Sequence, residues 1–521
     1  MSGCGTTRAV GKGASALALM ALLGIAAVFG GVRAAGDEGA ARPGENPPAK
    51  VPKLTVKQKP LCKLDEVLER LLTVSPDGRR VAYFAMRGEK YVLVVDGVDG
   101  KPYDNMAMVA PVFSADSKRV ACVGGDKEKK MFVVVDGVEG KRYEGIAAKG
   151  LTFSPDSKRT AYYAGMGGKY VAVVDGAEGK AYDEVQAGPP LFSPDSKQVA
   201  YGAMKDGKWT AVLEGAEGKK YDHVGYTAFS ADSAHFAYFA DSGGKYVAVM
   251  DGVEGKRYDM LGEEGVVFSA DSAHSAYVGG SGGKYFAVVD GVEGGAYDGV
   301  GLLTFSADGK RFAYKAVAGD KQFVVEGGKE GKAYQGVAYP TFSADSKRFA
   351  YVGSNGKTLA VVVDGVEGKQ YDSFGEGSLR FSPDGARLAY AAKSGKKWFM
   401  VVDGTEGAGC DGGVGKPVFS PDSKRLAYLQ RNGEKMRAVV DGAAGKEYDD
   451  MITPVFSPDS KCVGYDAASG DKWRIVVDGA EAGDYKGPEG DSRLSFESSA
   501  KCRDMMVGEK EIFLVEIEIA Q

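Results

Sequence analysis

An aspartate followed by glycine recurs along the chain in "VVDGVEGK" and close variants. The nine aspartates are Asp96, Asp136, Asp175, Asp251, Asp290, Asp364, Asp403, Asp441 and Asp478. Calcium-binding loops bring several oxygen ligands together in one loop, as in D-x-D-x-D-G, whereas here the spacing is D-G-x-E-G. Asp-Gly is a preferred pair for two-residue hairpin turns. We interpret these aspartates as turn residues and not as metal ligands.

Histidine, the side chain most often used for acid–base chemistry near neutral pH, occurs three times, as His223, His235 and His274. His235 and His274 hold the same place in consecutive "ADSAH" segments, where most copies carry arginine. A zinc site would need at least a third protein ligand, and none is evident. We therefore interpret both histidines as surface replacements of arginine.

Other catalytic signatures are weak. "GGSGG" at residues 279–283 matches G-x-S-x-G, but it lacks the strand–turn–helix context of a nucleophile elbow. The sequence contains no glycine-rich phosphate loop, HExxH or paired-cysteine zinc motif. We expect no enzymatic activity, catalytic residue, metal or cofactor.

A lysine stands at the entrance to the third apolar run of each repeat. Nine of these lysines form the candidate binding rim: Lys90, Lys130, Lys169, Lys208, Lys245, Lys284, Lys397, Lys435 and Lys472. Lys321, Lys357 and Lys510 hold the same place in three further repeats, and an aromatic residue often follows the lysine. A radial arrangement would place the lysines on one face, where they could attract an acidic partner or an anionic polymer. The alternative is that they protect exposed strand edges from aggregation.

Tyrosine recurs once per repeat as well, near the "YD" that closes each copy. The ten residues are Tyr103, Tyr143, Tyr182, Tyr221, Tyr258, Tyr297, Tyr334, Tyr371, Tyr448 and Tyr485. Exposed aromatic rings could form a stacking platform for sugars or bases. One ring at the same place in every copy instead favours packing between copies, with the hydroxyl reaching the edge.

These recurring residues belong to an internal repeat with steps of 37 to 40 residues. Its aspartates are Asp77, Asp116, Asp156, Asp195, Asp232, Asp271, Asp308, Asp345, Asp384, Asp422 and Asp459, and a twelfth, divergent copy is "LSFESSAKC". Residues 149–183 contain four runs rich in apolar, aromatic and β-branched residues, separated by "PDS", "GMGG" and "GAEG". Such runs predict four antiparallel strands. The repeat therefore predicts an all-β propeller of about twelve four-stranded blades.

The "FSPDSKR-x-AY" core, intact at residues 153–159 and 419–425, resembles the WD40-like propeller repeat found in TolB and many exported bacterial proteins. The likeness covers residues 62–521. It implies the propeller fold and an exported protein. The chain lacks the separate α/β domain that precedes the TolB propeller, so the resemblance transfers no binding residue.

The two ends of the repeat array complement each other. Residues 62–67, "CKLDEV", match a fourth strand without its blade, and "EIFLVEIEIA" matches a third strand with nothing after it. This pattern is typical of a ring closed by its own terminus. Because propellers usually have four to eight blades, we expect two tandem six-bladed rings, with repeats 1–6 in residues 62–299 and repeats 7–12 in 300–521. One large ring is the alternative, and the pairing of residues 62–67 distinguishes the two.

The N-terminus has a different composition. Two basic residues precede a 19-residue apolar run at 14–32, and "VRAAG" follows, which predicts a signal peptide at 1–34 or, if uncleaved, a membrane anchor. Residues 35–61 read as a flexible Pro/Gly/Ala-rich linker. The five cysteines after the signal, Cys62, Cys122, Cys410, Cys462 and Cys502, form no disulfide framework.

The mild net charge of −5 gives no support for nucleic-acid binding. We expect an exported, periplasmic or extracellular interaction platform whose partner is a protein or anionic polymer of the cell envelope. It would contact a membrane only through an uncleaved N-terminus. The alternative is an exported lyase or hydrolase with a site in the propeller channel.

Overall fold

The computed structural model describes residues 51–64, 67–68, 71–107, 109–147, 150–488 and 494–520. The predicted signal peptide, and the predicted linker up to residue 50, lie outside these ranges. Within the described residues, no helix is both long and apolar enough to span a bilayer.

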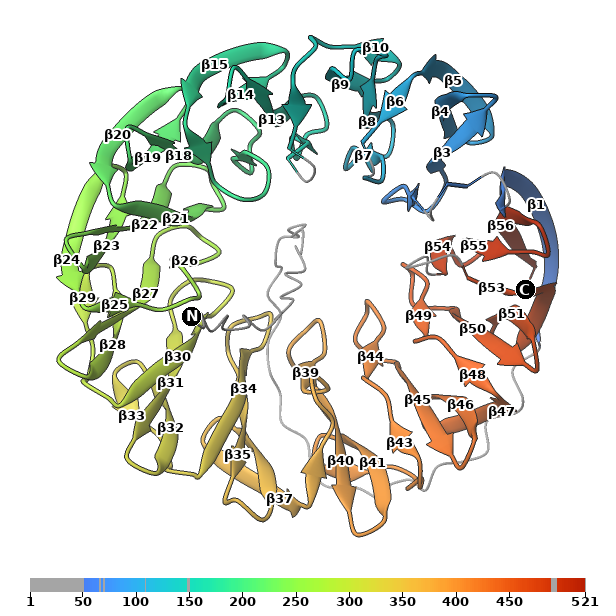
Figure 1. Cartoon of the computed structure of the whole chain (residues 1–521). Helices are drawn as coiled ribbons and strands as arrows, with labels where there is room; N and C mark the ends of the chain where they lie inside the picture. Colours follow the sequence, from blue (N-terminus) through green and yellow to red (C-terminus); the bar gives the residue numbers. More distant parts are fainter. Residues whose placement is uncertain are drawn as a thin grey trace, which may run out of the picture. The chain divides into compact units, whose positions relative to one another are not determined.

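Residues 53–520 form one ring of twelve antiparallel blades, which confirms the predicted fold and blade number (Figure 1). Blade 1 comprises β2–β5 (72–103), blade 2 β6–β10 (105–139), blade 3 β11–β15 (145–182), blade 4 β16–β20 (184–221), blade 5 β21–β24 (223–258), blade 6 β25–β29 (260–293), blade 7 β30–β33 (299–330), blade 8 β34–β37 (336–371), blade 9 β38–β42 (373–406), blade 10 β43–β47 (413–448), blade 11 β48–β52 (450–485), and blade 12 β53–β56 (487–520) with β1.

Blade 3 shows the common plan. Its inner strand is split into β11 (Gly145–Ile146) and β12 (Thr152–Phe153), and β13 (Thr160–Met166), β14 (Lys169–Val174) and β15 (Ala177–Tyr182) follow toward the outside. In blades 5, 7 and 8 the inner strand is continuous, as β21 (His223–Phe229), β30 (Gly299–Phe305) and β34 (Gly336–Phe342), with a bulge in the middle.

The "FSPDSKR" segment is the hairpin between the first and second strands, as predicted. In blade 3, Ser154 Oγ donates to Asp156 Oδ1 at 2.7 Å, and the Arg159 amide donates to Ser154 Oγ at 2.9 Å. Ser157 has a φ of 67°, which closes the turn. Its hydroxyl oxygen accepts from the Asp116 amide of blade 2 at 2.9 Å. The repeated serine therefore connects neighbouring blades as well as shaping its own turn.

The Asp-Gly pair is a hairpin turn, again as predicted. Asp175 and Gly176 have φ angles of 51° and 82°, the positive values that a type I′ turn requires. The Asp175 carboxylate accepts from the Thr160 amide at 2.9 Å. It thereby ties the turn between the third and fourth strands to the start of the second strand. The recurring aspartates have a structural task.

The ten recurring tyrosines are buried between blades, which confirms the packing interpretation and excludes them as an exposed stacking platform. Tyr182 of blade 3 packs edge-on against Tyr201 of blade 4, with ring centroids 6.2 Å apart. Its hydroxyl donates to Glu217 of blade 4 at 3.1 Å. Aliphatic residues of adjacent blades complete each core cluster. The hydrophobic core therefore consists of layers between blades.

The expectation of two six-bladed rings is wrong. The closing strand β1 (Lys53–Lys63) pairs antiparallel with β56 (Glu511–Ala520), which is the pairing expected for a single ring, and the two strands lie side by side at the outer edge of blade 12 (Figure 1). Blades 6 and 7, across the predicted boundary near Gly299, pack as other neighbours do. Tyr297 lies edge-on to Tyr314, with centroids 6.3 Å apart, and its hydroxyl donates to Glu330.

The closing strand also begins earlier than expected, inside the predicted linker. Cys62 and Lys63 pair with Ile512 and Glu511, but the strand extends back to Lys53 and ends at Lys63. Most of its side chains are exposed, so no alternation of buried residues reveals it in the sequence. Pro60 lies beside a register shift, a position that an edge strand tolerates.

Candidate binding surface

The rim lysines lie at the start of the third strands, at the edge of the ring away from the "SPDSKR" turns. Eight of the nine form ion pairs with an aspartate at the end of the outer strand of their blade or in the connection that follows it: Lys90–Asp104, Lys169–Asp183, Lys208–Asp222, Lys245–Asp259, Lys284–Asp298, Lys397–Asp411, Lys435–Asp449 and Lys472–Asp484. Lys130 differs, because Asp126 accepts a hydrogen bond from its backbone amide at 3.0 Å. The structure thus places the predicted lysines on one edge as a row of charge pairs.

These charge pairs are half exposed. In the Lys284–Asp298 pair, at 2.7 Å, the side chains retain 50% and 44% of their exposure. The hydrogen bond from Lys169 lowers the pKa of the Asp183 carboxyl, and the same bond raises the pKa of Lys169. Exposed pairs of this kind contribute little to stability. A lysine of the rim can therefore exchange its aspartate for an anionic group of a partner at small cost.

The histidines replace arginine within a contact that recurs between blades, which we call the arginine clamp. Its members are Arg80, Arg119, Arg159, Arg311, Arg348, Arg387 and Arg425. Arg119 Nε donates to Asp136 of its own blade at 2.8 Å. Its Nη1 donates to the backbone oxygens of Ser157 and Lys158 in the next blade at 3.2 and 2.6 Å, and its guanidinium lies over the Phe153 ring.

His235 and His274 keep the first half of the clamp. Their Nδ1 atoms lie 2.8 and 2.7 Å from carboxylate oxygens of Asp251 and Asp290. These hydrogen bonds raise the pKa of each histidine above its usual value of 6.5. Their side chains are 43% and 42% exposed, consistent with surface replacement of arginine. Within the described ranges, no group of three or more His, Cys, Asp or Glu side chains is arranged to hold a metal ion.

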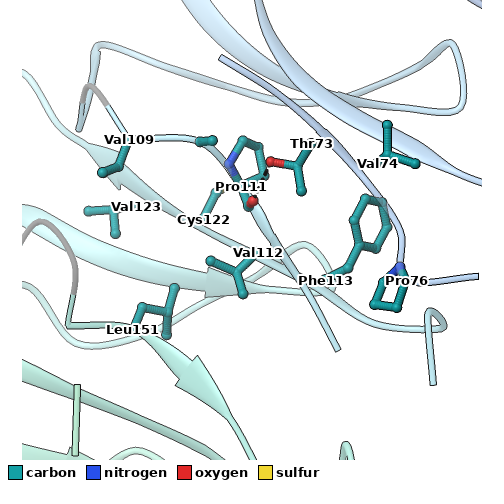
Figure 2. A pocket seen from close by; sticks show the side chains of 11 residues that line it. Thr73, Val74, Pro76, Val109, Pro111, Val112, Phe113, Cys122, Val123 and Leu151 are labelled. Atoms are coloured by element: carbon teal, nitrogen blue, oxygen red, sulfur yellow. Dashed lines mark hydrogen bonds between the residues drawn. The ribbon is translucent and has the colours of Figure 1, made fainter. Parts of the chain in front are cut away.

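A pocket of about 490 Å³ lies at the inner strands of blades 1 to 3. Figure 2 shows Phe113 beside Pro76 and Pro111 beside Thr73. Valines and Leu151 complete an apolar lining, and the Thr73 hydroxyl donates to Pro111 O at 2.8 Å. Burial raises the pKa of the Cys122 thiol, which also lines the pocket, to about 12. The thiol is therefore protonated and a poor nucleophile near neutral pH.

Two polar features escaped the sequence analysis. Eight lysines in or just after the outer strands pair with a glutamate of the next blade and form a girdle of ion pairs: Lys101–Glu139, Lys141–Glu178, Lys180–Glu217, Lys219–Glu254, Lys256–Glu293, Lys332–Glu367, Lys369–Glu406 and Lys446–Glu481. The repeated "EGK" in the sequence could have indicated these ion pairs, because it places a glutamate and a lysine at the same position in successive blades.

The second feature is a pair of carboxyl groups between blades 11 and 12. Asp466 and Asp504 are 1% and 2% exposed. Burial, and then the neighbouring Asp504, raise the pKa of Asp466 well above its ordinary value. The sequence signal was an aspartate within strand patterns that are otherwise apolar, "VGYDA" and "CRDMM". No disulfide joins any of the five buried cysteines of the ring.

Comparisons with known proteins yield similar folds but no family. No family model and no curated protein matches the chain. Among solved structures, the chain is similar to a eukaryotic initiation factor, with 14% identity over 61% of this chain and 94% of that one and a TM-score of 0.34.

The chain is also similar to KlHsv2 with loop 6CD replaced by a Gly-Ser linker, with 11% identity over 49% and 96% of the two chains and a TM-score of 0.24. A third structure is the β-propeller domain of Myceliophteria thermophila Cps50 (Swd1), with 10% identity, coverage of 48% and 94%, and a TM-score of 0.22.

Proposed function

We propose that this propeller is an exported, non-catalytic interaction platform, and that its partner is a protein or anionic polymer of the cell envelope rather than a nucleic acid. The observation that carries the proposal is the lysine rim, in which the same Lys–Asp pair recurs on one edge in eight blades. A regular row of exchangeable charges suits a long or repetitive ligand better than a small substrate.

Export is part of the same proposal. It is supported by the apolar run at residues 14–32 and by the resemblance of the repeats to those of TolB-type propellers. Cleavage after residue 34 would release the ring into the periplasm or the medium, whereas retention of the run would anchor it to the membrane. N-terminal sequencing of the protein recovered from the cell envelope distinguishes the two outcomes.

The test of the rim compares two triple variants. In the first, Lys208, Lys245 and Lys284 are changed to glutamate. In the control, Lys118, Lys158 and Lys197, exposed in the "SADSK" and "SPDSK" turns of the opposite edge, are changed to glutamate. Both variants change net charge equally. Binding to immobilised polyglutamate is measured at low and high salt.

We expect the wild type to bind polyglutamate at low salt and to lose binding as salt is added. The rim variant should lose most of its binding at low salt, while the control variant keeps the larger part. Equal losses in both variants would show that net charge alone determines binding, and would overturn the proposal that the lysine rim is the binding surface. A pull-down from cell-envelope extract then identifies the natural partner.

An exported lyase or hydrolase with a site in the ring channel remains the second candidate. The two functions differ in turnover, because a platform binds its ligand unchanged. Incubating captured envelope polymer with the protein and measuring its length and new reducing or acidic ends distinguishes them. Shortening of the polymer would favour the enzyme.

A further inference from the structure

The arginine clamp shows how this fold binds a guanidinium group between two blades. At the junction of blades 7 and 8, Arg311 Nη1 donates to the backbone oxygens of Ser346 and Lys347 at 2.9 and 2.7 Å. The guanidinium carbon lies 4.8 Å from the centre of the Phe342 ring. Two adjacent carbonyl groups and an aromatic face therefore make a guanidinium site, which the chain fills with its own side chain.

The junction of blades 5 and 6 contains the same receptor without its guanidinium. His235 stands in the arginine position, and its ring lies 6.5 Å from the Phe268 ring at an angle of 15°. Ser272 and Ala273 hold the places of Ser346 and Lys347. In the described part of the chain, no hydrogen-bond donor reaches the carbonyl oxygen of either residue. The imidazole is shorter than an arginine side chain and bonds to Asp251 of its own blade.

Two pockets at corresponding places show the effect of this replacement. The pocket between blades 7 and 8 has a volume of about 460 Å³ and is lined by Arg311, but not by Phe342, Ser346 or Lys347, which the guanidinium contacts. The pocket between blades 5 and 6 has about 410 Å³, and its lining includes the corresponding residues, Phe268, Ser272 and Ala273. Of these two junctions, only the one with histidine in the arginine position has its carbonyl groups and aromatic ring open to the pocket.

The charges of the two pockets differ in the same sense. The pocket between blades 7 and 8 is lined by three cationic residues, Lys310, Arg311 and Lys329, as well as by Glu326 and Glu330. No lysine or arginine lines the pocket between blades 5 and 6, whose titratable lining includes Glu254, Asp290, His235 and His274. A cation entering the second pocket would therefore meet carboxylates, carbonyl oxygens and an aromatic ring.

We propose that the pocket between blades 5 and 6 binds an arginine side chain of a partner polypeptide. The guanidinium would donate to the carbonyl oxygens of Ser272 and Ala273 beside the Phe268 ring, as Arg311 does at its own junction. Lysine fits less well, because its ammonium is a compact charge without a planar fork. The pocket lies on the "SPDSKR" edge of the ring, opposite the lysine rim, so this proposal and the rim can fail independently.

His235→Arg is the decisive variant, because it would fill the receptor with the residue used at the other clamps. The probes are two synthetic peptides, acetyl-Gly-Gly-Arg-Gly-Gly-amide and its lysine counterpart, together with free argininamide. His223→Arg, at an exposed histidine outside this pocket, is the control for added positive charge. Binding is measured by calorimetry, and the melting temperature of each variant reports its folding.

We expect the wild type to bind the arginine peptide at least tenfold more tightly than the lysine peptide. His235→Arg should weaken that binding at least tenfold and raise the melting temperature, whereas His223→Arg should leave binding within twofold. Equal binding of both peptides, no saturable binding to the wild type, or unchanged binding in His235→Arg would overturn the proposal. If argininamide binds but the arginine peptide does not, the pocket takes a small molecule instead of a polypeptide, and the proposal is overturned.

Discussion

The junction between blades 2 and 3 and the junction between blades 6 and 7 share an apolar layer but differ in their polar contacts. Between blades 2 and 3, Arg119 completes the clamp, Ser157 Oγ accepts from the Asp116 amide, and Lys141 pairs with Glu178 at 2.7 Å. Three kinds of polar contact therefore join these two blades.

All three contacts are changed between blades 6 and 7. His274 replaces the arginine, Gly309 replaces the bridging serine, and Gly295 replaces the girdle lysine. The buried Tyr297 and Tyr314 still pack across the junction. The apolar layer therefore holds the ring together, and the polar contacts reinforce it unequally. The junction near Gly299, where we expected a boundary between two rings, is instead a weakly reinforced junction within one ring.

The largest expected effects come from removing the shared layer. Tyr143→Ala and Tyr297→Ala each delete a buried ring, and we expect each to lower the free energy of unfolding by about 3–4 kcal/mol. Because this layer is common to both junctions, the two losses should agree to within about 1 kcal/mol. Urea denaturation followed by fluorescence measures both. A much smaller loss for Tyr297→Ala would mean that the apolar layer contributes less between blades 6 and 7 than between blades 2 and 3.

Removing the polar contacts should separate the two junctions. Arg119→Ala loses two hydrogen bonds to carbonyl groups, an ion pair and a cation–π contact, so we expect a loss of about 1–2 kcal/mol. His274→Ala loses one exposed ion pair and the stacking of the imidazole on Phe305, and it should cost about 0.5 kcal/mol. The same denaturation experiment measures both. A larger loss for His274→Ala would contradict the ranking of the junctions.

Restoring the clamp should strengthen the weaker junction. His274→Arg can reach the carbonyl oxygens of Gly309 and Lys310, which occupy the places that the clamp uses elsewhere, and the ring of Phe305. We expect a gain of about 1 kcal/mol. Hydrogen exchange should slow chiefly in β30 and β31 (Phe312–Ala318) of blade 7. A gain spread evenly over all blades would point to a general charge effect.

The smallest expected effect depends on pH. The hydrogen bond to Asp290 raises the pKa of His274 above 6.5 in the folded protein, so the folded state holds its proton more tightly than the unfolded state. The stabilisation is complete below pH 6.5 and is lost as pH rises through the folded pKa. The stability advantage of His274→Arg over the wild type should therefore widen from about pH 6 to about pH 9. If this advantage instead narrows as pH rises, the pKa of His274 is not raised by folding and the prediction is wrong.

The sequence predicted what lies within one repeat. Strand order, the "FSPDSKR" hairpin, the Asp-Gly turn and the buried tyrosines follow from local alternation and turn chemistry. Contacts between repeats were harder to predict, because Arg119 meets Ser157 and Lys158 only when two blades have docked. The aspartate partner of each rim lysine, such as Asp183 for Lys169, could have been predicted, because the two residues lie at the open end of one hairpin.

The ring count and the start of the closing strand could not be predicted, for a different reason. The number of blades in one ring depends on small differences in the angle between packed sheets, and each copy of the repeat is locally compatible with several ring sizes. Lys53–Lys63 carries few buried side chains, so it lacks the alternation by which the other strands were recognised.

The pairing of β1 with β56 also sets the order in which the molecule can fold. Every blade from 1 to 11 consists of consecutive strands, but Lys53 has Ala520 as its register partner, so blade 12 cannot be completed until residues 511–520 are available. Until then β1 is an open strand edge, and such edges invite pairing with other chains. Lys53, Lys57, Lys59 and Lys63, together with Pro60, make this edge a poor template for aggregation during that delay.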